Sequence, residues 1–107
     1  MNEIKVHIKQ LFDRIPRRHT SDNVKEMYSI LDAYEDLLKD IEGDAHFEKQ
    51  VVPFFEVLEP IRATIKKSND NKASKKAKDM LFDEGSSALK DNIEELLQLI
   101  GPGQPSK

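Results

Sequence analysis

The side chains best suited to proton transfer or metal binding are three histidines, and they lie far apart in the sequence. His7, His19 and His46 fall in three different predicted elements. A helical zinc site usually pairs two histidines four residues apart, and the chain has neither such a pair nor an H-E-x-x-H motif. His19 stands in a basic stretch, where protonation would add further positive charge. We therefore predict no metal site and no catalytic role for these residues.

A second candidate for metal binding is the segment 40–46, in which Asp, Glu, Asp and His alternate with other residues. A calcium-binding loop has glycine at its sixth position and glutamate at its twelfth. Here Gly43 is the fourth residue of the segment, and Val51 stands at the twelfth position. A helix that ends at Gly43, followed by Asp44 as the next N-cap, explains the same pattern. We predict no metal here either.

Catalysis and cofactor binding lack the residues that they need. Paired carboxylates such as Asp83 and Glu84 are typical of solvated helix faces, whereas general acid–base chemistry needs a carboxylate in a dry cleft. Ser86 and Ser87 suit a helix N-cap and have no histidine near them in the sequence. The chain has no cysteine, and its four glycines are too dispersed for a phosphate-binding loop. We predict that the protein is not an enzyme and holds no cofactor.

Charge is distributed in blocks along the chain. The formal net charge is +2 over residues 1–31, −7 over residues 32–59, +6 over residues 60–78 and −4 over residues 79–107. The positive block contains a candidate basic patch, formed by Arg62, Lys66, Lys67, Lys72, Lys75, Lys76 and Lys78. Three further basic residues are candidates to join it in space: Arg14, Arg17 and Arg18.

Two interpretations of the basic patch stay open. Opposite blocks can face one another within a helical bundle, where exposed ion pairs contribute about 0–1 kcal/mol each. Alternatively, the lysines form a surface for phosphates or for an acidic protein. An isoelectric point near 5.6 and the lack of aromatic residues among the lysines weaken the case for nucleic acid.

The segment 51–58, with the sequence Val-Val-Pro-Phe-Phe-Glu-Val-Leu, would be apolar on nearly all sides of a helix. Such a segment belongs in the centre of a core or in an interface with a partner. The candidate protein interface comprises Val51, Phe54, Phe55 and Leu58. Burial of these four residues in the core of the chain is the alternative.

Apolar residues recur at spacings of three and four over residues 24–41, which places them on one face of a helix. The members of this seam are Val24, Met27, Leu31, Tyr34, Leu38 and Ile41. A seam this regular needs other helices to cover it, and apolar stripes over residues 4–15 and 89–100 are suited to do so. The pattern predicts an all-α fold, a small bundle of four to five helices. A homodimer through the seam is an open alternative.

Proline residues and turn signals set the predicted boundaries. We predict helices at about 2–14, 22–42, 45–66, 72–83 and 87–100. Pro16 ends the first helix, and a kink or break near Pro53 or Pro60 interrupts the third. Residues 1–101 should form a single helical domain, and residues 102–107 a flexible tail.

Small polar residues and glycines predict how individual helices begin and end. Thr20, Ser21 and Asp22 are all competent N-caps for the second helix, and the last two are preferred. Gly43 should end that helix in the left-handed conformation. Gly85 should end the fourth helix, just before a serine cap of the fifth.

Length and composition define the class of protein. At 107 residues the chain is one domain, and no apolar run approaches the roughly 18–20 residues that span a bilayer. We predict a cytoplasmic protein without membrane contact, which the lack of cysteine also suits. We expect a small, non-catalytic helical interaction protein, a regulator, adaptor, inhibitor or immunity-type factor that binds another protein. The alternative is a nucleic-acid-associated accessory protein that uses the basic segment 62–78.

Overall fold

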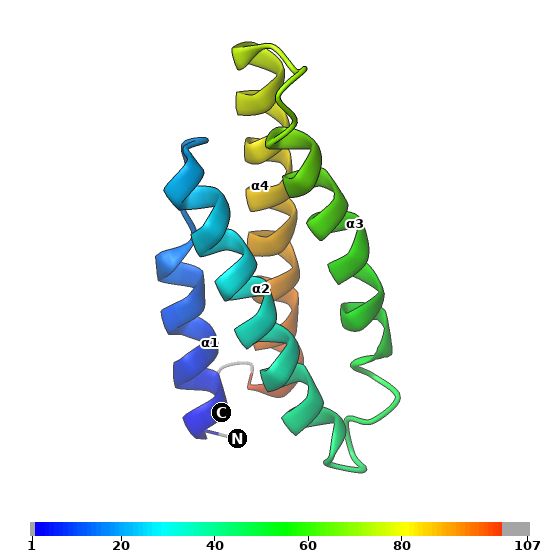
Figure 1. Ribbon diagram of the computed structural model, residues 1–107. Coiled ribbons are helices and arrows are strands. Elements are labelled where there is room, and N and C mark those ends of the chain that lie inside the picture. The colour runs from blue at the N-terminus through cyan, green and yellow to red at the C-terminus, as the bar shows by residue number, and fades with distance from the viewer. Residues whose placement is uncertain (1, 102–107) are drawn as a thin grey trace.

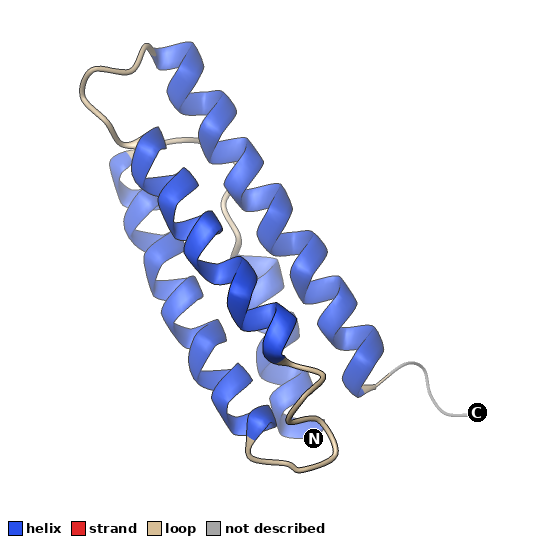
Figure 2. Cartoon of the chain, turned by 90° about the vertical axis from the view of Figure 1, so that its right-hand side faces the viewer, coloured by secondary structure: helices blue, strands red, loops and turns tan. Residues whose placement is uncertain are grey.

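The computed structural model describes residues 2–101, which form four helices and no strand (Figure 1, Figure 2). The helices are α1 (Asn2–Arg14), α2 (Ser21–Glu42), α3 (Val52–Ser68) and α4 (Lys75–Ile100). They run alternately up and down, so that each helix packs against the next and α1 packs against α4. The bundle is elongated, with a longest dimension of 48 Å. The predicted all-α fold, a small helical bundle, is confirmed.

The regular seam of α2 lies in the centre of the bundle. All six predicted members of the seam are buried, and so is Ile30 on the same helix. They belong to one core cluster with buried side chains of the other three helices, among them Ile8, Ile61 and Ile93. Helices of the same chain therefore cover the seam, which leaves it no exposed face for the homodimer considered above.

The connection between α1 and α2 completes the cover where α1 is too short. α1 has 13 residues and α2 has 22, so α1 lies along only part of α2 (Figure 1). Beyond α1, Ile15 is buried, and the carbonyl group of Pro16 accepts a hydrogen bond from Ser86 Oγ at 3.2 Å. The His19 ring packs edge-on against the buried Phe82, with the ring centroids 5.8 Å apart. A non-helical segment thus closes one end of the core.

The last two predicted helices are a single helix, α4, and the predicted break at Gly85 is wrong. Gly85 is buried in the interior of α4, and a Cβ atom on it would lie 2.6 Å from Ile65 Cδ1 of α3. Ser86 is also buried and is not a cap. The N-cap of α4 is Ser74, whose hydroxyl accepts a hydrogen bond from the Ala77 backbone N–H at 3.1 Å. Glycine occurs here because α3 and α4 approach each other closely, not because a helix ends.

The third helix begins later than predicted, and only one of its prolines marks a boundary. Residues 43–51 form turns, and α3 starts at Val52 with Pro53 in its first turn, where a missing N–H costs no helical hydrogen bond. Pro60 lies inside α3, which continues through it to Ser68 without a break. Pro60 is exposed, so its ring faces away from the core.

Two predicted caps of α2 also differ from the structure. Thr20 is the N-cap, since its hydroxyl accepts a hydrogen bond from the Asn23 backbone N–H at 3.0 Å. The preferred candidates, Ser21 and Asp22, already lie in the first turn. Gly43 follows the helix with φ −64° and ψ −16°, a right-handed conformation rather than the predicted left-handed one. The predicted tail, residues 102–107, lies outside the described residues.

A buried hydrogen bond between Tyr34 and Asn92 joins α2 to α4 across the core. Tyr34 Oη donates to Asn92 Oδ1 at 2.5 Å, and both side chains are buried. The two polar groups satisfy each other where neither meets bulk water. Burial, together with the negative charge of Glu95, raises the pKa of the Tyr34 hydroxyl far above its usual range. Tyr34 is therefore a neutral donor at physiological pH.

A valine at position 85 should destabilise the protein, because its side chain would occupy space filled by Ile65. We expect Gly85→Val to lower the free energy of unfolding by about 2 kcal/mol. Ser87→Val on the exposed side of the same helix introduces the same side chain without the clash and is the matched control. Urea denaturation of both variants gives the comparison. If both variants lowered the free energy of unfolding by the same amount, the close approach of α3 and α4 at Gly85 would be contradicted.

Removing the Tyr34 hydroxyl should leave the Asn92 amide buried without its donor. We expect Tyr34→Phe to lower the free energy of unfolding by about 1–3 kcal/mol at neutral pH. An unfolded tyrosine ionises near pH 10, whereas the buried one stays neutral, so stability should fall as the pH rises through that value. Phe cannot ionise, and the difference between variant and native chain should therefore shrink above about pH 10. Urea denaturation across this pH range measures both effects, and a constant difference would contradict the role of burial.

Candidate binding surfaces

The structure divides the predicted protein interface between the core and the surface. Val51 and Leu58 are buried and belong to the core, with exposed fractions of 0% and 2%. Phe54 and Phe55 are half-buried and pack against the core with part of each ring accessible. A spacing of seven residues puts Val51 and Leu58 on one helical face, and the two phenylalanines flank that face. Only the phenylalanines remain available to a partner.

The start of α3 nevertheless presents several accessible apolar side chains close together. Val52 is 44% exposed, and Pro53 is exposed beside it. With the half-buried phenylalanines and Val57 they form what we call the α3 apolar surface: Val52, Pro53, Phe54, Phe55 and Val57. Two exposed carboxylates, Glu56 and Glu59, lie on the same stretch of helix. These carboxylates follow Val52 by four and seven residues and so share its outward face of α3. The surface therefore combines apolar side chains with two carboxylates.

The opposite end of the bundle is basic. The α1–α2 and α3–α4 connections lie together there, at the top in Figure 1. All lysines of the predicted basic patch belong to the last turn of α3, to the α3–α4 connection or to the first turns of α4, and all but the half-buried Lys78 are exposed. Together with two arginines of the α1–α2 connection they form the basic end: Arg17, Arg18, Lys66, Lys67, Lys72, Lys75, Lys76 and Lys78.

Arg62, by contrast, is engaged in the bundle and does not contribute to the basic end. Its guanidinium donates to Asp32 at 2.7 Å and to Glu35 at 3.1 Å, both on α2. Burial alone would lower the pKa of Arg62, but the hydrogen bond to Asp32 and the two carboxylate charges raise it on balance. Complementary charge within the bundle, the first interpretation of the basic patch, thus applies to this residue.

The arginines around Pro16 are divided in the same way. Arg14 makes two hydrogen bonds to Glu26 of α2, at 3.1 and 3.2 Å, and is therefore engaged like Arg62. Arg17 and Arg18 are exposed and lie beside the start of α4. They border an open hollow of about 500 Å³ together with His19, Thr20, Lys75, Asp79 and Asp83. Tertiary structure brings these arginines to the lysines of α4, from which more than fifty residues separate them in sequence.

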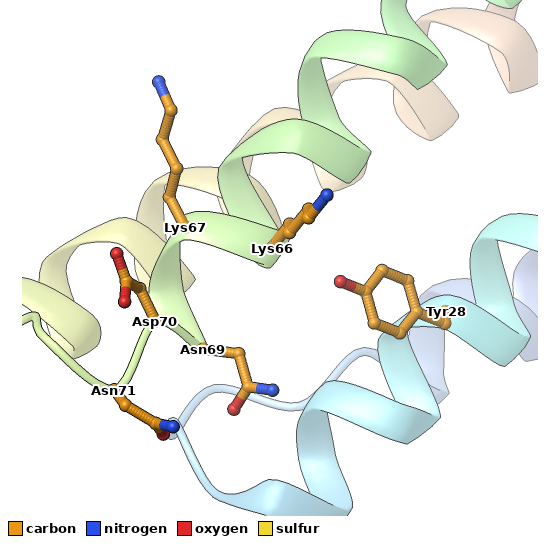
Figure 3. A pocket seen from close by; sticks show the side chains of 6 residues that line it. All are labelled: Tyr28, Lys66, Lys67, Asn69, Asp70 and Asn71. Atoms are coloured by element: carbon orange, nitrogen blue, oxygen red, sulfur yellow. The ribbon is translucent and has the colours of Figure 1, made fainter.

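A second open hollow of about 500 Å³ lies between α2 and the α3–α4 connection (Figure 3). We call it the α2–α3 hollow, and its lining residues are Tyr28, Lys66, Lys67, Asn69, Asp70 and Asn71. The two lysines were predicted as members of the basic patch. Tyr28 and the two asparagines were not predicted, because Tyr28 stands beside the α2 seam and the asparagines only indicated a loop.

The residues considered for catalysis and metal binding stay apart. His7 is exposed on α1, His19 packs on Phe82, and His46 is exposed in a turn beside Phe47. Within residues 2–101, no group of three or more His, Asp or Glu side chains is placed to hold a metal ion. No helix in this part of the chain is both long and apolar enough to cross a membrane.

Comparison with known proteins gives no guide to the family. No family model, curated protein or solved structure matches this chain. A proposed function therefore depends on the surfaces described above.

Proposed function

We propose that the protein is a non-catalytic interaction protein that binds another protein through the α3 apolar surface. The observation that carries this proposal is the set of accessible apolar side chains at the start of α3, led by Val52 at 44% exposed. Aromatic and aliphatic side chains that already rest on a packed core lose little freedom on binding and are typical anchors of interfaces. Regulators, adaptors, inhibitors and immunity-type factors act in this way.

The charges on this surface indicate the chemistry of the partner. Glu56 and Glu59 are exposed and point into solvent near the apolar side chains. Exposed carboxylates in an interface favour a partner with lysine or arginine opposite them, and they speed association more than they add affinity. We therefore favour a partner whose apolar patch also carries basic residues.

A charge placed on the α3 apolar surface should prevent binding. We expect Val52→Glu to weaken binding of the partner at least about tenfold, because a carboxylate would lose its water in the interface. Val6→Glu on α1 is the matched control, since Val6 is a valine of similar exposure, at 52%. Affinity capture from the native host with the three chains identifies the partner, and titration with the purified partner gives the dissociation constants. Equal binding by Val52→Glu and the native chain would exclude this surface.

A second candidate function, a nucleic-acid-associated accessory protein, is favoured by one observation. Arg17 and Arg18 border the same hollow as Lys75, so the basic end is larger than the 62–78 segment that was predicted from sequence. Lysine and arginine on one surface neutralise phosphates of a nucleic-acid backbone. Asp79 and Asp83 border the same hollow and oppose such binding, and for this reason we rank this function second.

Charge reversal at the basic end tests the second candidate. If the protein binds nucleic acid there, its affinity for DNA or RNA should fall steeply as salt rises, and Lys75→Glu/Lys76→Glu should abolish binding. Lys39→Glu/Lys49→Glu, at two exposed lysines outside the basic end, is the control with the same change in net charge. Fluorescence anisotropy with duplex and single-stranded oligonucleotides at two salt concentrations provides the measurement. Weak binding that both double variants reduce equally would exclude a specific role.

A further inference from the structure

The α2–α3 hollow contains an unusual excess of hydrogen-bond donors. Its lining residues supply two lysine ammonium groups, two asparagine amides and one tyrosine hydroxyl. The single carboxylate, that of Asp70, accepts a hydrogen bond from the Lys72 backbone N–H at 2.9 Å and thereby holds the turn. Two lysines and one carboxylate give the lining residues a formal net charge of +1, which favours an anion.

Three of these donors, on Tyr28, Lys66 and Asn69, border the same hollow from different elements. Figure 3 shows the Tyr28 hydroxyl pointing from α2 toward the end of α3, and the Lys66 side chain projecting from α3 above it. The Asn69 amide projects below the end of α3, and Lys67 points away from Tyr28. Among the hydrogen bonds of residues 2–101, none involves the side chain of Tyr28, Lys66 or Asn69. Their donors are therefore available to a ligand.

The C-terminal end of α3 repels an anion only weakly, because hydrogen bonds occupy carbonyl groups of its last turn. The carbonyl groups in the last turn of a helix carry partial negative charge. Here the carbonyl of Lys66 accepts from the Asn69 backbone N–H at 3.0 Å, and that of Lys67 accepts from the Asp70 N–H at 3.1 Å. Lys66 and Lys67 lie in this last turn, and their positive charges offset the remaining partial negative charge of the carbonyl groups.

The chemistry of the donors and the size of the hollow define the ligand. A lysine ammonium binds phosphate as a point charge, and hydroxyl and amide donors match the remaining phosphate oxygens. A phosphate ion has only five heavy atoms and is much smaller than this hollow. The hollow of about 500 Å³ is larger and lies within the range of small-molecule sites. A phosphate group attached to a small organic group fits better than the bare ion.

We propose that the α2–α3 hollow binds a small phosphate monoester, with its phosphate group held by Lys66, Tyr28 and Asn69. This site goes beyond the proposed function and is independent of it, because the α3 apolar surface lies at the other end of α3 (Figure 1). A ligand here joins α2 to the α3–α4 connection and stabilises that connection.

Nuclear magnetic resonance of the isotope-labelled full chain tests this site directly. The probes are inorganic phosphate, glycerol phosphate and a short oligonucleotide, each added at constant ionic strength with chloride as the balancing anion. We expect saturable shifts from glycerol phosphate in the amide signals of Tyr28 and residues 66–72 and in the side-chain amides of Asn69 and Asn71. Binding of inorganic phosphate should affect the same signals more weakly.

Variants separate a specific site from general attraction to lysines. Lys66→Gln should weaken glycerol phosphate binding about tenfold or more, since it removes a charged donor, and Tyr28→Phe should weaken it about threefold. Lys49→Gln, at an exposed lysine in the α2–α3 connection, is the control and should leave the affinity unchanged. The spectra themselves report whether each variant is folded.

Several results would overturn the proposal. Shifts that do not saturate at about 20 mM glycerol phosphate, or that spread over all lysines, would show only screening of charge. If Lys49→Gln and Lys66→Gln weakened glycerol phosphate binding equally, the result would also show only general attraction to lysines. Tighter binding of the oligonucleotide at the same phosphate concentration would assign the hollow to a polyanion instead of a small monoester.

Discussion

Burial of the α2 seam is the constraint on which the rest of the bundle depends. The seam runs along nearly the whole of α2, and each of its six members is buried. Full burial of an aliphatic or aromatic side chain contributes about 1.5–3 kcal/mol, so the seam is the largest continuous source of stability along the chain. The other helices and the α1–α2 connection are arranged to cover it. Tyr34 introduces the one polar group of the seam, and Asn92 of α4 satisfies it.

Close contact between α3 and α4 determines the shape at the basic end. Because Gly85 has no side chain, Ile65 can lie against the α4 backbone, and α4 passes this point as one helix of 26 residues. α4 is longer than α3, so its first turns extend beyond the other helices (Figure 1). Those turns carry Lys75, Lys76 and Lys78, which therefore project from the end of the molecule. The length of one helix thus decides where positive charge is exposed.

The up-and-down order of the helices converts blocks of charge in the sequence into ends of the molecule. Residues 60–78 carry seven basic side chains and one acidic side chain, and most of this block surrounds the α3–α4 connection. The acidic block, residues 32–59, surrounds the α2–α3 connection at the other end (Figure 1). Midway along the helices, where the acidic and basic blocks meet, Arg62 pairs with Asp32 and Glu35. The two ends therefore offer different chemistry to a partner, and the α3 apolar surface lies at the acidic end.

The sequence by itself determined the helical class, the α2 seam and the bounds of α1, because apolar periodicity and the stop at Pro16 are local properties. It also located the lysines of the basic end. Contacts between distant segments decided the rest. Gly85 and the serines after it match a helix end locally, yet the approach of α3 made them the interior of α4. Likewise, only packing buried Val51 and Leu58 while Phe54 and Phe55 stayed partly accessible. Packing also paired Arg62 with Asp32 of α2. It placed Tyr28, Lys66 and Asn69 around one hollow. Which face of a helix is covered depends on its neighbours in space, and local spacing does not contain that information.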